Sequence, residues 1–249
     1  SDDGYKVAFS TDVNGNDIYT SDMSAEDKYA AAKTAALGYL EAAGYTVADG
    51  KVTAAPEGAK MEYEVWIPAD GKGDHPSFMI LTLAKDALAE IGMTLTIKDL
   101  TNSSDMWTAL EAQQVAMWAA AWGATPDPDM YQVYHKDSTA TSTWNWGYRQ
   151  IKQNVGGKYD AELALINDLS DLIDAARRTN DKAERSDLYS RALDIVMQLA
   201  IELPTYQRDD LFAYNADKID VSTMTPEEEC SPYKGLTGDL YLISLITAR

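Results

Sequence analysis

The sequence has few of the residues that form disulfides or bind metals. It contains one cysteine, Cys230, and two histidines, His75 and His135. A single cysteine excludes an internal disulfide, which suits either a cytosolic protein or an exported bacterial one that does without bridges. Neither histidine has neighbours at metal-ligand spacing, so we expect both to be surface residues. No metal and no other cofactor is predicted.

The familiar catalytic motifs are also missing. The sequence has no G-x-S-x-G, no glycine-rich phosphate loop and no C-x-x-C. Asp127 and Asp129 form a carboxylate pair that a hydrolase could use, but their loop spacing does not set the separation of about 5–9 Å that glycoside chemistry needs. We therefore expect a protein that is not an enzyme.

Positive charge and long apolar runs are scarce. The formal net charge is -19, which argues against partners such as nucleic acid or an anionic membrane surface, because like charges repel. The densest apolar run, residues 115–124, is half the length of about 20 residues that a membrane-spanning helix needs. The chain begins SDDGYK, with neither the basic nor the apolar region of an export signal.

What the sequence does contain is an alternation of helical and extended patterns. Residues 1–23 and 46–60 are expected as loop or extended chain. Helices are predicted at residues 24–44, 77–91, 104–112, 159–177 and 182–203, and strands at residues 61–67, 93–97 and 115–122. The strand–helix–strand order implies parallel pairing with a right-handed crossover. Because residues 115–122 are nearly all apolar, we expect them to form a buried central strand. The fold class is α/β, with a mostly parallel sheet flanked by helices.

The segment from 179 to 208 is the best specified part of the chain. Asp181 can cap a helix, and Glu184 can return a bond to the Asp181 amide in a capping box. Pro204 stops the helix, and residues 205–208 resemble a short strand that carries Tyr206. The apolar face of the helix is formed by Leu188, Ala192, Ile195, Val196, Leu199 and Leu203.

Four stretches, taken in order, resemble one protein family. They are residues 31–45 (AAKTAALGYLEAAGY), residues 91–100 followed by Trp107, residues 115–131 together with 142–148, and residues 179–208. Their order and spacing resemble those of the family 5 extracellular solute-binding proteins, which are receptors of ABC importers for oligopeptides, dipeptides and nickel. The resemblance runs from about Ala30 to the end. It implies one lobe of a type II periplasmic-binding-protein-like fold.

The family's receptors are longer and fold as two lobes around a ligand. We therefore expect residues 1–249 to be the C-terminal lobe alone, with 1–23 as a loop or extended segment and 215–249 as an extension of the lobe. The resemblance implies that the protein is extracellular, at the cell surface or periplasmic. It also implies that the full-length form is anchored to the membrane by a lipid. The implied partners are a small solute, the membrane permease and the N-terminal lobe of the same receptor, and we expect a monomer.

Five of the six tryptophans lie between Trp107 and Trp146, which indicates an aromatic pocket. We expect Trp66 and Trp118 to be core residues. From the resemblance, Trp107 and Trp122 flank the cleft, and the backbone of Gly123 approaches the ligand. The full set of expected ligand-binding residues is Trp107, Trp122, Gly123, Thr125, Asp127, Trp144, Asn145, Trp146 and Tyr206.

One departure from the family bears on the ligand. Peptide binders commonly carry an aspartate that holds the peptide's free amine at the position where this chain has Thr125. Asp127 can substitute, because a carboxylate beside an ammonium makes a charge-assisted bond. The sequence therefore predicts a solute-binding component of an ABC import system, foremost for oligopeptides. A receptor lobe for a sugar or a metal chelate, and a structural or protein-binding module with packed tryptophans, remain as alternatives.

Overall fold

The computed structural model describes residues 9–68, 73–123, 127–140, 147–206, 211–230 and 234–246. The chain divides into two compact units. The first is Ser1–Ala120 with Met130–Thr205, and the second is Ala121–Asp129 with Tyr206–Arg249. No helix in the described ranges combines the length and the apolar character that crossing a bilayer requires.

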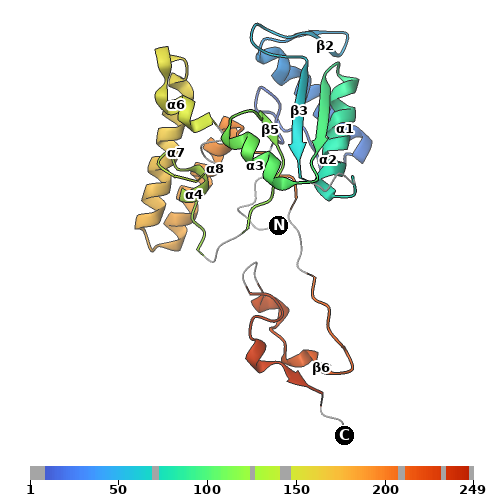
Figure 1. The fold of residues 1–249 in the computed structure, drawn as a ribbon, viewed down its shortest axis with the longest axis vertical. Coiled ribbons are helices and arrows are strands. Elements are labelled where there is room, and N and C mark those ends of the chain that lie inside the picture. Colours follow the sequence, from blue (N-terminus) through green and yellow to red (C-terminus); the bar gives the residue numbers. More distant parts are fainter. Residues whose placement is uncertain are drawn as a thin grey trace. The chain divides into compact units, whose positions relative to one another are not determined.

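The first unit holds most of the regular structure and is α/β (Figure 1). Its first half contains α1 (Ala25–Ala42), β1 (Thr46–Ala48), β2 (Lys51–Ala54), β3 (Glu62–Ile67), α2 (Pro76–Glu90), β4 (Thr94–Asp99), α3 (Ser103–Glu111) and β5 (Met117–Trp118). Its second half contains α4 (Tyr131–Tyr134), α6 (Arg149–Gln153), the 3-10 helix η2 (Val155–Gly157), α7 (Asp160–Arg178) and α8 (Lys182–Leu199).

A three-stranded parallel sheet, in the order β4-β3-β5, organises the first half. The predicted strand–helix–strand unit is confirmed as β3–α2–β4. The prediction of a buried central strand at residues 115–122 is wrong, because β3 is the middle strand and β5 is a two-residue strand at its side. The ladder ends where the Ala119 amide donates to the Trp66 carbonyl oxygen. The residues that follow are alanines, which have low strand propensity and offer little side chain to pack.

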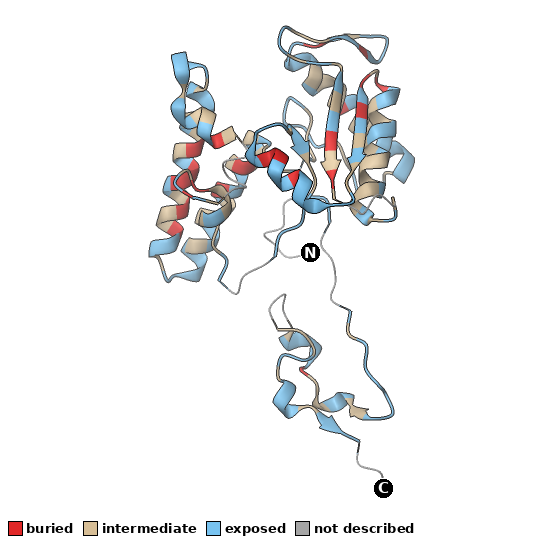
Figure 2. Ribbon diagram, in the orientation of Figure 1, coloured by how far each residue is buried: buried red, intermediate tan, exposed pale blue. Residues whose placement is uncertain are grey.

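One face of this sheet is open. Val65, Ile67 and Leu95 are buried on one face, whereas the alternate positions carry exposed or half-buried residues (Figure 2). Those alternate positions are Glu62, Glu64 and Trp66 of β3, Thr94, Thr96 and Lys98 of β4, and Trp118 of β5. Trp66 and Trp118 are therefore half-buried on the open face, and the expectation that both are core residues is wrong. Parallel sheets are usually covered on both faces, so this open face is unusual.

Residues 46–60 were expected to be a loop, but they contain an antiparallel hairpin of β1 and β2. Asp49 and Gly50, which connect the strands, have φ values of 51° and 71°. An Asp-Gly pair with both φ angles positive is the signature of a two-residue hairpin turn, and it was missed. The hairpin contributes Val52 to a core with Tyr45 and Met93.

Polar side chains cap the starts of the first three helices. The Ser24 hydroxyl accepts the Asp27 amide at the start of α1, and Asn102 caps α3 in the same way. α2 begins at Pro76, and the residue before it is the cap: His75 Nδ1 accepts the Ser77 amide at 3.1 Å. His75 is thus a half-buried capping residue and not a free surface histidine.

The second half of the first unit is built on the pair α7 and α8. Leu169, Ile173, Ala192 and Val196 form its buried core. The prediction that the second helix reaches residue 203 is wrong, because α8 ends at Leu199. The next residue, Ala200, takes a left-handed conformation with φ of 50° and closes the helix four residues before Pro204. Leu203, predicted on the apolar face, is exposed.

In the capping box at the start of α8, Thr179 lies between Asp181 and Glu184. Asp181 accepts the amides of Ala183 and Glu184, as predicted. Its own amide donates to Thr179 Oγ1, and the Thr179 hydroxyl donates to Glu184. Thr179 therefore stands between the two partners that the sequence pattern paired directly.

The second unit has little regular structure. Its elements are β6 (Ile219–Asp220), η3 (Val221–Thr223), η4 (Glu227–Glu229), η5 (Leu240–Leu242) and β7 (Ser244–Leu245), with β6 and β7 antiparallel. Within its described residues, Thr225 alone is buried. Tyr206 does not lie in a strand, contrary to the prediction for residues 205–208, and residues 207 and 208 lie outside the described ranges.

Candidate functional site

Two indole rings meet at the carboxyl edge of the parallel sheet. Trp118 ends β5, and Trp107 projects from α3, whose Met106 and Leu110 are buried. The ring centroids of Trp107 and Trp118 lie 5.7 Å apart with an interplanar angle of 71°, an edge-to-face contact. Trp107 remains 41% exposed. Edge-to-face packing holds the two rings in a defined arrangement while a large part of Trp107 faces solvent.

Trp118 also belongs to a row across the open face of the sheet. The register pairs Trp66 with Lys98 on one side and with Trp118 on the other, so the three side chains share a face. Lys98 Nζ lies 3.4 Å from the centroid of the Trp66 ring, a cation–π contact. The Trp66 indole N–H donates to Glu64, which fixes the ring from the same strand.

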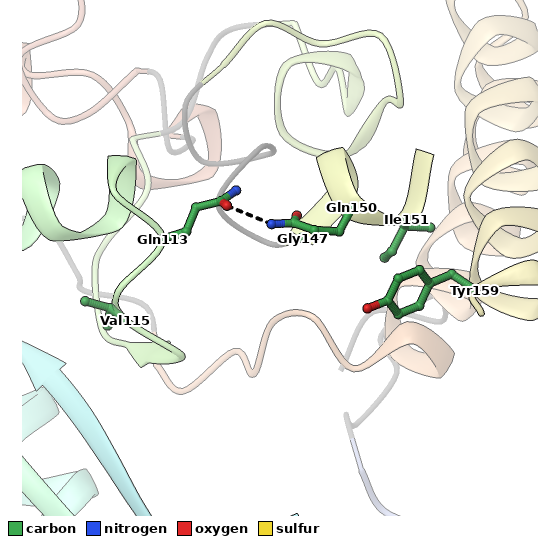
Figure 3. A pocket seen from close by; sticks show the side chains of 6 residues that line it. All are labelled: Gln113, Val115, Gly147, Gln150, Ile151 and Tyr159. Carbon is green, nitrogen blue, oxygen red and sulfur yellow. Dashed lines mark hydrogen bonds between the residues drawn. The ribbon is translucent and has the colours of Figure 1, made fainter. Parts of the chain in front are cut away.

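A hollow of about 320 Å³ lies beside the start of β5 (Figure 3). It is lined by Gln113, Val115, Gly147, Gln150, Ile151 and Tyr159. Gln150 Nε2 donates to Gln113 Oε1 at 2.8 Å and ties α6 to the segment that precedes β5. Gly147 follows directly on residues 144–146, so the predicted aromatic segment leads in sequence into this hollow.

Buried polar contacts fix the chain on both sides of residues 141–146. After that segment, Tyr148 is 1% exposed and its hydroxyl donates to the Tyr134 carbonyl oxygen at 3.1 Å. Burial raises the pKa of Tyr148, so the hydroxyl stays protonated and can donate. The Tyr134 hydroxyl in turn donates to Glu202, and burial followed by this bond raises the pKa of Tyr134.

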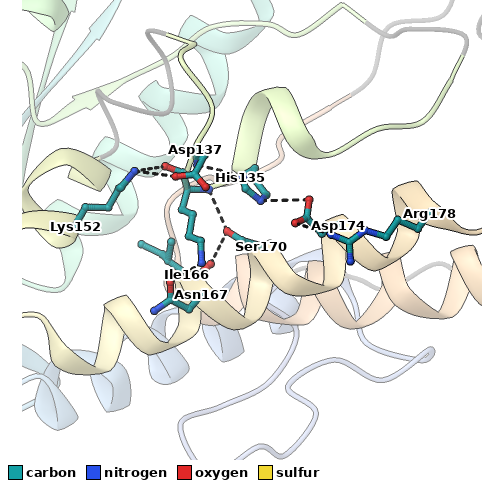
Figure 4. Close-up of polar contacts among 9 residues, drawn as sticks. His135, Asp137, Lys152, Ile166, Asn167, Ser170, Asp174 and Arg178 are labelled. Carbon is teal, nitrogen blue, oxygen red and sulfur yellow. Dashed lines mark hydrogen bonds and ion pairs between the residues drawn. The ribbon is translucent and has the colours of Figure 1, made fainter.

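Before that segment, His135 is 4% exposed, so the prediction of a surface histidine is wrong. Its Nδ1 accepts the Asp137 amide at 3.0 Å (Figure 4). Its ring stacks on Tyr131 with centroids 4.2 Å apart. Nε2 lies 3.6 Å from Asp174 Oδ1. Burial lowers the pKa of His135, and the nearby carboxylate of Asp174 opposes that shift only in part.

Ser170 of α7 joins this cluster to the helix pair. Its Oγ accepts the Lys136 amide at 3.0 Å and donates to the Ile166 carbonyl oxygen at 2.8 Å (Figure 4). Lys152 of α6 bonds Asp137 and lowers the pKa of that carboxyl group. These contacts place residues 135–140, which lead into 141–146, on a rigid support.

The predicted site residues fall into three groups. Trp107 lies in the first unit. Trp122, Gly123, Asp127 and Tyr206 belong to the second unit, where Trp122 is 50% and Tyr206 41% exposed. Thr125, Trp144, Asn145 and Trp146 lie outside the described residues. The structure therefore brings Trp107 together with Trp118, a residue that was not predicted for the site.

The sequence analysis also missed Trp66 and Lys98. A signal for Trp66 was present, because Trp66 has the same strand phase as Glu62 and Glu64 and must share their solvent-facing side.

In the described ranges, no group of three or more histidine, cysteine, aspartate or glutamate side chains is arranged to hold a metal ion.

No protein-family model matches the chain, and no curated protein matches it. Solved structures similar to it include NikA from Brucella suis in complex with Fe(III)-EDTA, with 18% identity, a TM-score of 0.45, and coverage of 69% of this chain and 30% of that one. The oligopeptide-binding protein AppA from Bacillus subtilis, in complex with a nonapeptide, has 14% identity and a TM-score of 0.47, with coverage of 74% and 33%. NikZ from Campylobacter jejuni in complex with Ni(L-His) has 18% identity and a TM-score of 0.46, with coverage of 70% and 30%. The matches thus span about a third of the length of these proteins.

Proposed function

We propose that this chain is part of a solute-binding component of an ABC importer, of the family 5 type that its sequence motifs resemble. The observation that carries the proposal is the exposed Trp107 ring, which packs on Trp118 at the carboxyl edge of the three-stranded parallel sheet. Ligands of open α/β sheets bind beyond the carboxyl ends of the strands. Aromatic walls with a few polar groups are typical of small-molecule sites.

The proposed role is binding without chemical conversion. The indole rings provide apolar contact area, and polar groups near them orient the solute. Trp122, Gly123, Asp127 and Tyr206 are proposed as further ligand contacts, together with Thr125, Trp144, Asn145 and Trp146. An oligopeptide is the first candidate solute, and a sugar or a metal chelate is the alternative.

The proposal includes a second lobe. In a two-lobed receptor, closure buries the solute on both sides, so one lobe alone keeps about half of the contacts. If that loss amounts to about 4 kcal/mol, the dissociation constant rises about a thousandfold. We therefore propose that this C-terminal lobe is monomeric, binds its solute at millimolar strength or weaker, and acts outside the cytoplasm. Its partners there are an N-terminal lobe and a permease, and the full-length form is lipid-anchored.

Tryptophan fluorescence and calorimetry test this proposal. The 249-residue chain is titrated with a mixture of short peptides and separately with a nickel–histidine chelate, the kinds of ligand held by the similar solved structures. We expect millimolar binding by one class and about tenfold weaker binding by Trp107→Ala, since stacking on one indole contributes about 1 kcal/mol or more. Tyr241→Ala, which removes an aromatic ring 83% exposed in the second unit, is the control and is expected to bind as the unchanged chain does.

Two results would contradict parts of the proposal. Micromolar binding by residues 1–249 would mean that the site is complete in this chain, and the half-site idea would fail. Binding that Trp107→Ala leaves unchanged would remove the sheet edge as the site.

A protein-binding module is the second candidate function. Leu240, Tyr241, Leu242, Leu245 and Ile246 of the second unit are all exposed, and the run 240–246 carries no charge. Exposed apolar patches of this kind mark protein interfaces. Self-association in light scattering, together with no affinity for any small solute in the titrations, would favour this second candidate.

A further inference from the structure

We propose that the open face of the β4-β3-β5 sheet selects a solute that carries one carboxylate on an elongated aromatic body, with Lys98 as the carboxylate anchor. This inference rests on the proposed solute-binding function and adds the chemical class of the solute. It also adds two contacts, Lys98 and Trp66, that the family resemblance did not supply.

The charge of Lys98 is the first argument. The chain has 40 acidic and 21 basic residues, yet no carboxylate among the described residues forms an ion pair with Lys98. Its ammonium instead lies over the Trp66 ring at 3.4 Å from the centroid. One side of the ammonium therefore rests on an aromatic face, and its N–H donors on the other side can bind an anion. A carboxylate placed there gains a charge-assisted hydrogen bond.

The surroundings limit the ligand to a single negative charge at this end. Glu64 lies on the same face of β3 and binds the Trp66 indole N–H. Its carboxylate holds the ring that supports Lys98, and it repels any second anionic group near the anchor. A monocarboxylate fits this arrangement, and a phosphate or dicarboxylate fits it less well.

The position of Trp118 sets the length of the body. Lys98, Trp66 and Trp118 lie in one register row on three neighbouring strands. Adjacent strands are about 4.8 Å apart, so Lys98 and Trp118 are separated by about 10 Å at the backbone. A solute whose carboxylate meets Lys98 must extend about that far to place a ring against Trp118 and the exposed Trp107. Two linked aromatic rings span this distance, and planar rings stack favourably on indole.

The test uses the full 249-residue chain and three matched probes. These are biphenyl-4-carboxylate, its neutral carboxamide and the cationic 4-phenylbenzylamine. Binding is followed by tryptophan fluorescence and by the indole N–H signals in ¹H–¹⁵N spectra, with the Trp66 signal identified from Trp66→Phe. We expect the carboxylate to bind about threefold to tenfold more tightly than the carboxamide, the range of a partly exposed charged contact. Raising the salt concentration from 0.05 to 0.5 M should weaken binding of the carboxylate but leave binding of the neutral carboxamide unchanged.

Lys98→Gln is the decisive variant, because glutamine keeps most of the stem and removes the charge. We expect it to abolish the preference for the carboxylate while the carboxamide binds as before. Lys51→Gln, which changes an exposed strand lysine of β2, is the matched control and should keep the preference. Circular dichroism spectra confirm that both variants fold.

Equal affinity for the carboxylate and the carboxamide would overturn the inference, as would a preference that survives in Lys98→Gln. Absence of binding by the carboxylate up to 10 mM, on the order of the weakest affinity considered, would also overturn it. Peptide binding that depends on Trp107 without any preference for negative charge would leave the proposed function standing and remove only this inference.

Discussion

Ser170→Ala is the most direct test of how the support of residues 135–140 is built. The Ser170 side chain is 1% exposed, and its hydroxyl is the acceptor of the half-buried Lys136 amide. Removing that acceptor leaves the amide unpaired, at a cost of about 1–3 kcal/mol. The bond that Ser170 donates to Ile166 is local to the helix, and its loss matters less. Alanine recovers about 0.5 kcal/mol in helix propensity, so the net loss is about 1–2 kcal/mol.

Thermal and urea unfolding measure this loss. For a chain of this size, about 1–2 kcal/mol corresponds to a fall in Tm of roughly 2–8 °C. Hydrogen exchange adds a local measurement. The Lys136 amide should lose its protection in Ser170→Ala, whereas the protection of the α8 amides should fall only by as much as the global stability falls. Ser186→Ala is the control, because Ser186 is exposed on α8 and the change gains the same propensity without the loss of a side-chain hydrogen bond to a described residue. Equal stability of the two variants, with unchanged exchange at Lys136, would refute the reasoning.

Two further predictions concern a buried histidine and a close backbone approach. Burial lowers the pKa of His135 against the opposing effect of Asp174, so the folded state favours the neutral ring; stability is therefore full above the unfolded pKa of about 6.5 and falls as the pH drops below it. Tm values measured from pH 7.5 to 5 should show this fall in the unchanged chain and a shallower one in His135→Gln, and identical slopes would contradict the assignment. Gly92→Ala should destabilise the chain by more than about 2 kcal/mol, because Gly92 has φ of 90° and a Cβ there would lie 2.6 Å from the Val52 carbonyl oxygen. Gly58→Ala, at φ of 83° with no atom within 4 Å of its Cβ, is the matched control in urea unfolding, and a similar loss in both would show that the contact with Val52 does not matter.

Local signals predicted much of the fold. Asp181 marked a helix start because a side-chain oxygen can satisfy the first free amides, and the structure shows this cap. The order of strands and helices predicted the parallel pairing of β3 and β4. The errors arose where the local sequence was compatible with two structures. Pro204 permitted the helix to continue to residue 203, but Ala200 adopted the left-handed conformation first.

The candidate site was less predictable than the fold. Trp107 was expected there, but its partner Trp118 was assigned to the core because an apolar run of eight residues resembles a central strand. Whether such a run is central or at an edge depends on strand order, which is a tertiary property. The burial of His135 depends on packing against α7, where its neighbour Asp174 lies 39 residues further along the chain, and no local pattern reports it.

The division of the chain has a consequence for how the protein is made. The second unit combines Ala121–Asp129 with Tyr206–Arg249, so the 76 residues 130–205 are synthesised between its two segments. At about 5–20 residues per second, translation takes roughly 4–15 s to cover that interval. During this time the nascent chain displays Trp122 without the segment that later joins it, whereas β3, α2 and β4 are contiguous and can assemble as they emerge. Ribosome-associated chaperones should therefore engage this chain most strongly while residues 130–205 are being translated.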